Sequence, residues 1–298
     1  MYDYNKPLVI IRIGQSNATT AGTKTMVRPV APNNMFIVDG DVKTGNLHLD
    51  VYRTGINSDP NKFLTTEDFS TEVMFAQKFR AENPGQPIFV VKEAVAGNGI
   101  DAELTNGNWN ANGGARYNAL VARLEFIKLE LVAQGITDYN QVILFNQGEA
   151  DALHVASAQR YDDNLYDLIS SLRGETLNGE ALINADTMWI QERIRPELAD
   201  KNYAGYAGAA YVREGIYTAL AQDTADGYRN AVVDLDFHQD SWNKIHPGTT
   251  GGWLQGIADR TFAAWKGTYL AEGYVDTHDA VPDEYAFVDL AHQTQDAY

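Results

Sequence analysis

The sequence predicts a single α/β domain in which a parallel β-sheet of five strands is covered by helices on both faces. Apolar runs typical of buried strands alternate with segments of helical spacing along most of the 298 residues. The strand runs are apolar on both faces, as strands between two layers of helices must be. The sequence shows no internal repeat, low-complexity block or linker that would divide the chain.

Five apolar runs predict the strands, and each leads into a polar or glycine-rich turn. The first run is interrupted only by Arg12 and stops at Gly14. The predicted strands are residues 8–13, 87–91, 141–145, 187–191 and 231–235.

Five segments with apolar residues at helical spacing predict the helices between these strands. In the first segment the apolar set includes Phe69, Val73, Ala76 and Phe79. Gly135 follows the second segment where a glycine commonly ends a helix. The predicted helices are residues 69–81, 117–133, 156–172, 206–221 and 249–265.

Two parts of the chain do not fit this alternation. Residues 17–68 form a long polar insertion, in which the short apolar pieces 35–38 and 47–52 could be small strands or a hairpin. Such an insertion is either a binding loop or a surface excursion. We therefore expect a domain over 1–270, followed by an acidic C-terminal extension, 271–298, that wraps the surface or mediates assembly.

Composition excludes several classes of function. A formal net charge of −17 argues against nucleic acid as a partner, because phosphates are held by Lys and Arg. Without cysteine there can be no disulfide, thiolate metal site or cysteine nucleophile. The sequence shows no signal peptide and no apolar run approaching the roughly 20 residues of a membrane span. We expect no membrane association, and the compartment and oligomeric state stay open.

The predicted strand ends carry the groups that serine hydrolysis requires. These groups are Ser16, Gly97 with Asn98, Gln147 with Glu149, and His246. Because the ends of parallel strands share one edge of a sheet, such residues can converge. The reaction needs a nucleophile, a base, an acid that orients the base, and donors for the oxyanion. Each residue also has a structural alternative: a helix N-cap for Ser16, a surface loop for His246, a helix N-terminus for Glu149 and a turn for Asn98.

Four short blocks, in order, resemble those of the SGNH hydrolases. The blocks are Gly14-Gln15-Ser16-Asn17, Ala94-Val95-Ala96-Gly97-Asn98, Gln147-Gly148-Glu149-Ala150-Asp151 and Ile245-His246-Pro247. The most similar branch comprises carbohydrate O-acetylesterases such as sialate O-acetylesterase and acetyl xylan esterase. The resemblance covers about 8–265 and implies a flavodoxin-like three-layer α/β/α sandwich with a central five-stranded parallel sheet.

The resemblance also implies catalytic roles. Ser16 would be the nucleophile, His246 the general base, and Glu149 the acidic partner of the histidine. The backbone N–H groups of Ser16 and Gly97, with the side-chain amide of Gln147, would donate to the oxyanion. Asn243, Asp151 and Asn98 would hold these groups in position without taking part in the reaction themselves. This chemistry needs no cofactor and no metal.

One departure from the family pattern bears on activity. The family usually has an acidic residue three positions before the histidine, and this chain has Asn243. An Asn carbonyl can hold the imidazole ring but brings no negative charge to it, so Glu149 would have to supply that charge. Whether Glu149 or Asn243 is the main partner of His246 stays open, and Asp240 is a weaker candidate.

The function implied is that of a serine esterase that removes O-acetyl groups from an acetylated carbohydrate, a polysaccharide or sialic acid, through an acetyl-serine intermediate. Residues 28–68, Trp109 and Trp242 would shape the side of the site that faces the sugar. A lipase or thioesterase of the same fold is an alternative. So is a non-catalytic carbohydrate-binding or structural protein, such as part of a virion appendage, with a decayed site.

Overall fold

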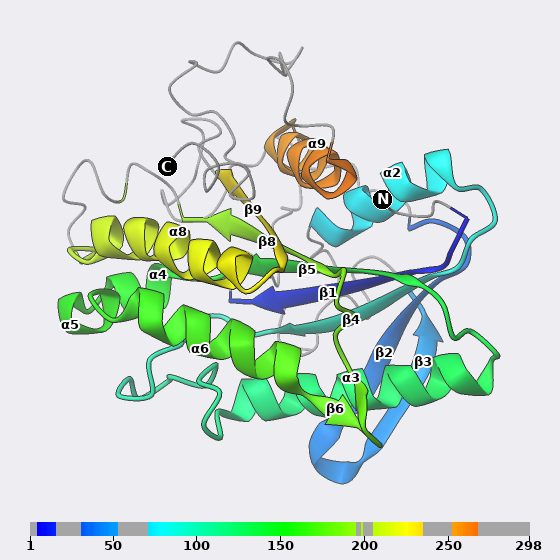
Figure 1. The fold of residues 1–298 in the computed structure, drawn as a ribbon, viewed down its shortest axis with the longest axis horizontal. Helices are drawn as coiled ribbons and strands as arrows, with labels where there is room; N and C mark the ends of the chain where they lie inside the picture. The colour runs from blue at the N-terminus through cyan, green and yellow to red at the C-terminus, as the bar shows by residue number, and fades with distance from the viewer. Residues whose placement is uncertain are drawn as a thin grey trace.

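The computed structural model describes residues 5–15, 31–52, 71–194, 198, 205–234 and 252–267. Its main sheet has seven strands in the order β3-β2-β4-β1-β5-β8-β9, and all neighbouring pairs run parallel except β2 and β3 (Figure 1). The strands are β1 (Leu8–Gly14), β2 (Met35–Asp41), β3 (Asn46–Val51), β4 (Ile88–Ala94), β5 (Asn140–Asn146), β8 (Met188–Arg193) and β9 (Arg229–Asp234).

The five predicted strands are confirmed as β1, β4, β5, β8 and β9. Every residue of β1, β4, β5 and β8 is buried, because helices cover both faces of the sheet. Numbered along the chain, these five strands lie in the order 2-1-3-4-5, which is the flavodoxin-like order. The predicted fold class is therefore correct.

The prediction of five strands in the sheet is wrong, because part of the insertion joins it. The apolar pieces at 35–38 and 47–52 form β2 and β3, an antiparallel hairpin. Its first strand also pairs with β4, from Met35 opposite Ile88 to Ile37 opposite Val90. This pairing connects segments about 50 residues apart, so the apolar pieces alone could not predict it. Residues 16–30 and 53–70 of the insertion, and the extension 271–298, lie outside the described residues.

Two layers of helices enclose the sheet (Figure 1). One layer contains α3, α6 and α8, whose apolar faces share a core with the sheet. The other contains α2 and α9, which meet through Phe75, Phe79, Phe262 and Trp265. The long helices are α2 (Thr71–Glu82), α3 (Ala115–Ala133), α6 (Tyr161–Gly174), α8 (Ala209–Ala225) and α9 (Gly252–Lys266).

The helix predicted over 156–172 is interrupted. The structure has α5 (Val155–Ala158) and then α6, separated at Arg160, which caps α6 with a non-helical backbone. The Arg160 guanidinium bonds Asp101 and Glu103, a pairing that local periodicity cannot reveal. The sequence also did not predict α4 (Glu149–Ala152), nor the short hairpin of β6 (Thr176–Leu177) and β7 (Glu180–Ala181).

A buried ionic cluster lies between the sheet and the α2 layer. We call its two cations and two carboxylates, Arg12, Lys92, Glu72 and Glu192, the charged quartet. Arg12 Nη2 lies 2.8 Å from Glu192, and Lys92 Nζ lies 2.7 Å from Glu72. Because buried charges need partners, this cluster explains the one charged residue in the first apolar run.

In the part of the chain that the structure describes, no helix is both long enough and apolar enough to cross a membrane.

Candidate active site

Three neighbouring strands end together at the centre of the sheet. Gly14 at the end of β1 pairs with Ala94 on one side and Asn146 on the other. The chain order of the strands reverses between β1 and β5, and open α/β sheets bind ligands at such a switch point, beyond the carboxyl ends of the strands. The first three sequence blocks therefore follow strands that end side by side.

Gly14 allows a close approach between β1 and the end of β5. Its φ is +136°, and a Cβ placed on it would lie 1.9 Å from the carbonyl oxygen of Asn146. The next residue, Gln15, donates its backbone N–H to that carbonyl at 2.9 Å. Only glycine fits here, because any side chain would push the two strand ends apart.

Gln15 also links the first block to the third through its side chain. Its Nε2 donates a short hydrogen bond to Oε2 of Glu149, the first residue of α4. The residues are 1% and 4% exposed. The residue that holds the Glu149 carboxylate, Gln15, is thus the immediate sequence neighbour of Ser16. Gln15 and Glu149 themselves are 134 positions apart in the chain.

Gln147 is held on every polar atom of its side chain. Tyr161 OH lies 2.9 Å from its Oε1 and 3.1 Å from its backbone carbonyl. Its Nε2 donates to the carbonyl of Asn98, at 3.2 Å, and to the carboxylate of Asp151. The amide expected to donate to the oxyanion therefore faces protein oxygens, and a substrate oxyanion would share or replace the longer bond to Asn98.

Asp151 joins the turn after β4 to the turn after β5. Its carboxylate accepts from the backbone N–H groups of Ile100 and Asp101, each at 3.1 Å, from Ser157 Oγ at 2.9 Å, and from Gln147. Burial raises the pKa of Asp151, against the lowering effect of these uncharged donors. Asp151 thus organises the loop that carries Gly97 and Asn98.

The loop after β4 is tied down by amide groups. Gly97 has a φ of +71°, and its carbonyl accepts a bond from the side chain of Asn106. Asn98 donates to the carbonyls of Val95 and Ala96 and accepts from Asn108. These bonds fix the peptide groups around Gly97, whose N–H is the expected oxyanion donor.

The expectation that Trp109 faces the sugar is wrong. Its ring is fully buried and packs edge-on against Phe145, and its indole N–H donates to the carbonyl of Gly14 at 3.2 Å. Trp109 therefore supports the end of β1 from inside the core. Its partner in the same expectation, Trp242, lies outside the described residues.

Comparison with known proteins identifies the family. Residues 6–195 match the model of a family described as carbohydrate esterase, sialic acid-specific acetylesterase. The chain belongs to this family. The match includes the blocks at Gly14–Ser16 and 147–151, and it confirms the resemblance to carbohydrate acetylesterases of the SGNH type. Among curated protein sequences, no relative of the chain was found.

Solved structures share the fold of this chain at low sequence identity. An Arabidopsis thaliana protein matches with a TM-score of 0.64 and 18% identity, over 88% of this chain and 98% of its own. NanS matches with a TM-score of 0.54 and 13% identity, over 90% and 99%. A Xanthomonas citri protein described as a novel carbohydrate acetylesterase matches with a TM-score of 0.51 and 17% identity, over 90% and 58%.

The expected nucleophile and base, Ser16 and His246, lie outside the described residues, as do Asn243 and Asp240. Their meeting stays a prediction. Among the described site residues, the structure brings Gln147, Asn98 and Asp151 into one hydrogen-bonded group, and it places Glu149 against Gln15. Sequence reasoning missed the roles of Gln15 and Tyr161. The only signal for Gln15 was a polar residue directly after a buried strand.

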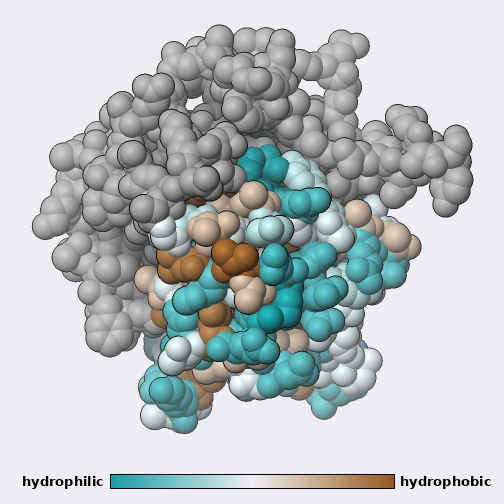
Figure 2. Space-filling view, turned by 90° about the vertical axis from the view of Figure 1, so that its left-hand side faces the viewer, coloured by the Kyte–Doolittle hydropathy of each residue, from teal (hydrophilic) through white to brown (hydrophobic). Residues whose placement is uncertain are grey.

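The face toward which the strands point is partly apolar. Figure 2 shows hydrophobic residues gathered near the middle of this face among hydrophilic ones. At this edge the turn from α4 to α5 exposes Leu153 and Val155, at 47% and 41%. Within the described residues, no group of three His, Cys, Asp or Glu side chains could hold a metal ion.

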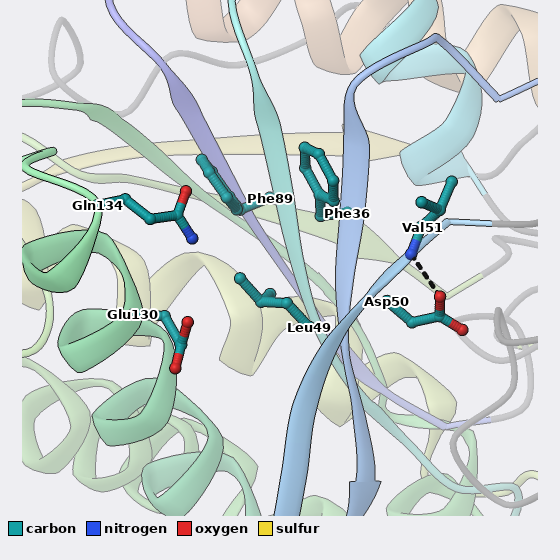
Figure 3. Close-up of a pocket in the computed structure, with 7 residues that line it drawn as sticks. All are labelled: Phe36, Leu49, Asp50, Val51, Phe89, Glu130 and Gln134. Carbon is teal, nitrogen blue, oxygen red and sulfur yellow. Dashed lines mark hydrogen bonds between the residues drawn. The ribbon is translucent and has the colours of Figure 1, made fainter.

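A pocket of about 260 Å³ lies elsewhere on the molecule. Figure 3 shows side chains from β2, β3, β4 and the end of α3 around it, namely Phe36, Leu49, Asp50, Val51, Phe89, Glu130 and Gln134. Phe89 is the second residue of β4, at the opposite end of that strand from Ala94. The pocket is therefore separate from the candidate active site.

Proposed function

We propose that the protein is a serine esterase that removes O-acetyl groups from a carbohydrate through an acetyl-serine intermediate. The observation that carries the proposal is the family match over residues 6–195, which includes Ser16 and the block with Glu149. The geometry supports it, since the first three blocks follow strand ends that meet at the switch point of the sheet.

In the first half of the reaction, Ser16 Oγ attacks the acetyl carbonyl carbon while His246 takes the hydroxyl proton. The oxyanion that forms is stabilised by the N–H groups of Ser16 and Gly97 and by Gln147, each donor contributing roughly 3 kcal/mol. The carbonyl re-forms, the bond to the sugar oxygen breaks, and His246 protonates that oxygen. The products are the free sugar hydroxyl and acetyl-Ser16.

In the second half, water replaces the sugar. His246 takes a proton from water, whose oxygen attacks the acetyl carbon, and that proton then passes to Ser16 Oγ as acetic acid leaves and loses its remaining acidic proton to solvent to become acetate. Glu149 stabilises the positive charge on His246 in both halves. Its buried place beside Gln15 supports this role, because a carboxylate acts most strongly on an imidazolium in a water-excluded site.

The experiment is acetate release from acetylated xylan, O-acetylated sialic acids and p-nitrophenyl acetate. Ser16→Ala should lower kcat by about 10⁶-fold, to the assay background, because the nucleophile is lost. Ser170→Ala, on the exposed side of α6, is the matched control and should keep full activity. A fluorophosphonate should label the wild type once and leave Ser16→Ala unlabelled.

Three outcomes would contradict the proposal. Full activity in Ser16→Ala would exclude the mechanism. Activity that rises from acetyl to longer acyl esters would favour a lipase or thioesterase, and sugar binding without Ser16 labelling would favour a non-catalytic protein.

A further inference from the structure

We propose that Gln15 is a positioning residue, whose carboxamide holds the Glu149 carboxylate where it can support His246. The inference rests on the proposed function, since it assigns Gln15 a part in the same reaction. It goes beyond that function because the resemblance gives Gln15 no role. The reacting atoms need not touch Gln15, which would act only through Glu149.

The backbone fixes where Gln15 stands. Its N–H is bonded to the Asn146 carbonyl, and the absence of a side chain at Gly14 permits that contact. The indole of Trp109 holds the carbonyl of Gly14 from the other side. Because this backbone is restrained, the Gln15 side chain starts from a fixed position and can hold its partner rigidly.

The bond from Gln15 acts on a carboxylate at the start of a short helix. Glu149 begins a helix of only four residues, α4, after Gly148, whose φ is +140°. Gly148 is itself held tightly, since a Cβ there would lie 2.7 Å from Val212 and 3.0 Å from Ile194. The backbone of Glu149 is therefore fixed, but three side-chain torsions still separate it from the carboxylate. The bond from Gln15 Nε2 restrains the carboxylate itself.

The other polar atom of the Gln15 side chain makes no hydrogen bond among the described residues. This atom, Oε1, is buried and meets no donor in this part of the chain. Buried Gln141, by contrast, accepts at Oε1 from the Asn184 N–H and Thr187 Oγ1 and donates from Nε2 to the Leu182 carbonyl. A buried amide is unfavourable unless bonded, so the polar group of Gln15 is present for Glu149.

The main test is Gln15→Met, which keeps the length of the side chain and removes the donor. We expect kcat on p-nitrophenyl acetate to fall about 100-fold with KM unchanged, the effect of a catalytic group displaced by about 1 Å. The acidic limb of the kcat profile should move to lower pH. A carboxylate close to an imidazolium favours its protonated form, so displacing Glu149 should weaken that effect on His246, whereas a purely structural defect would not move this limb.

A double-mutant cycle shows whether Gln15 acts through Glu149. The Glu149→Gln variant is itself expected to lose about 10⁴-fold in kcat. In that background, Gln15→Met should lower kcat further by less than about 3-fold. Equal losses in both backgrounds would overturn the inference. Gln141→Met is the matched control, because Gln141 lies at the other end of β5, and it should leave the kcat profile unchanged.

A second variant keeps the test valid if Gln15→Met folds poorly. Gln15→Glu preserves the shape and can donate to Glu149 only while the two carboxyl groups share a proton. The ratio of its kcat to that of the wild type should therefore fall as pH rises. A constant ratio would overturn the inference, whereas failure of the proposed function itself would appear as a wild type without esterase activity or Ser16 labelling.

Discussion

Asp151 and Glu72 are both fully buried carboxylates, yet their pKa values are shifted in opposite directions. Among the residues that the structure describes, Asp151 at the strand-end edge accepts only from uncharged donors, and burial raises its pKa. Burial also favours protonation of Glu72, but Lys92 and Arg12 more than offset this, so the pKa of Glu72 is lowered. The fold thus separates a strand-end carboxylate, Asp151, which is held by neutral groups, from a charged quartet that neutralises itself. The first region suits chemistry, and the second suits stability.

The largest expected effect comes from breaking the charged quartet. Glu72→Gln leaves Lys92 and Arg12 short of one buried negative charge, so the free energy of unfolding should fall by about 3–5 kcal/mol. Urea denaturation at neutral pH measures this loss. Glu82→Gln is a matched control on the same helix, because Glu82 pairs with Lys266 at the surface and should cost less than about 1 kcal/mol. Equal costs would mean that burial does not distinguish the two regions.

The second effect tests the strand-end edge through its backbone. Gly14→Ala forces a Cβ against the Asn146 carbonyl and keeps a positive φ, so we expect a loss of about 3 kcal/mol together with loss of esterase activity. Thermal unfolding and acetate release provide the two measurements. Gly135→Ala has a φ of +74° but open space around the new Cβ, so it should cost only about 1–2 kcal/mol and keep activity. Similar results for both would show that the close contact between β1 and β5 is unimportant.

The smallest effect is a difference in how stability depends on pH. The pKa of Asp151 is raised in the folded protein. Its contribution to the free energy of unfolding is therefore complete below the pKa that Asp151 has in the unfolded chain, and it is lost as pH rises through the pKa in the folded protein. For Glu72, with a lowered pKa, the contribution is present above the unfolded pKa and is lost as pH falls through the folded pKa. We therefore expect that, in urea denaturation from about pH 3 to 8, the free energy of unfolding of Asp151→Asn rises relative to that of the wild type as pH rises. The free energy of unfolding of Glu72→Gln should approach that of the wild type as pH falls. If the difference from the wild type changed in the same direction with pH for both variants, the comparison would be contradicted.

Local patterns predicted most of the fold and part of the site. The strands at 8–13 and 141–145 were predictable because burial on both faces requires continuous apolar runs, and Gly135 marked the end of α3. The partners of Arg12 and Gln15 were not predictable, because residues 180 and 134 positions away supply them. Trp109 shows the same limit, since nothing local separates an aromatic that faces a sugar from one that supports β1.

The hairpin of β2 and β3 has a consequence for how the molecule behaves toward other copies of itself. Without it, β4 would be the outermost strand, with unpaired backbone groups beside the apolar Phe89 and Val91. Such an edge promotes aggregation. The hairpin pairs with the start of β4, and Arg123 continues the protection by donating to the Val38 and Gly40 carbonyls at 3.0 and 3.1 Å. The edge strand of the sheet is then β3, whose exposed polar residues Asn46 and His48 disfavour pairing with a strand of another molecule.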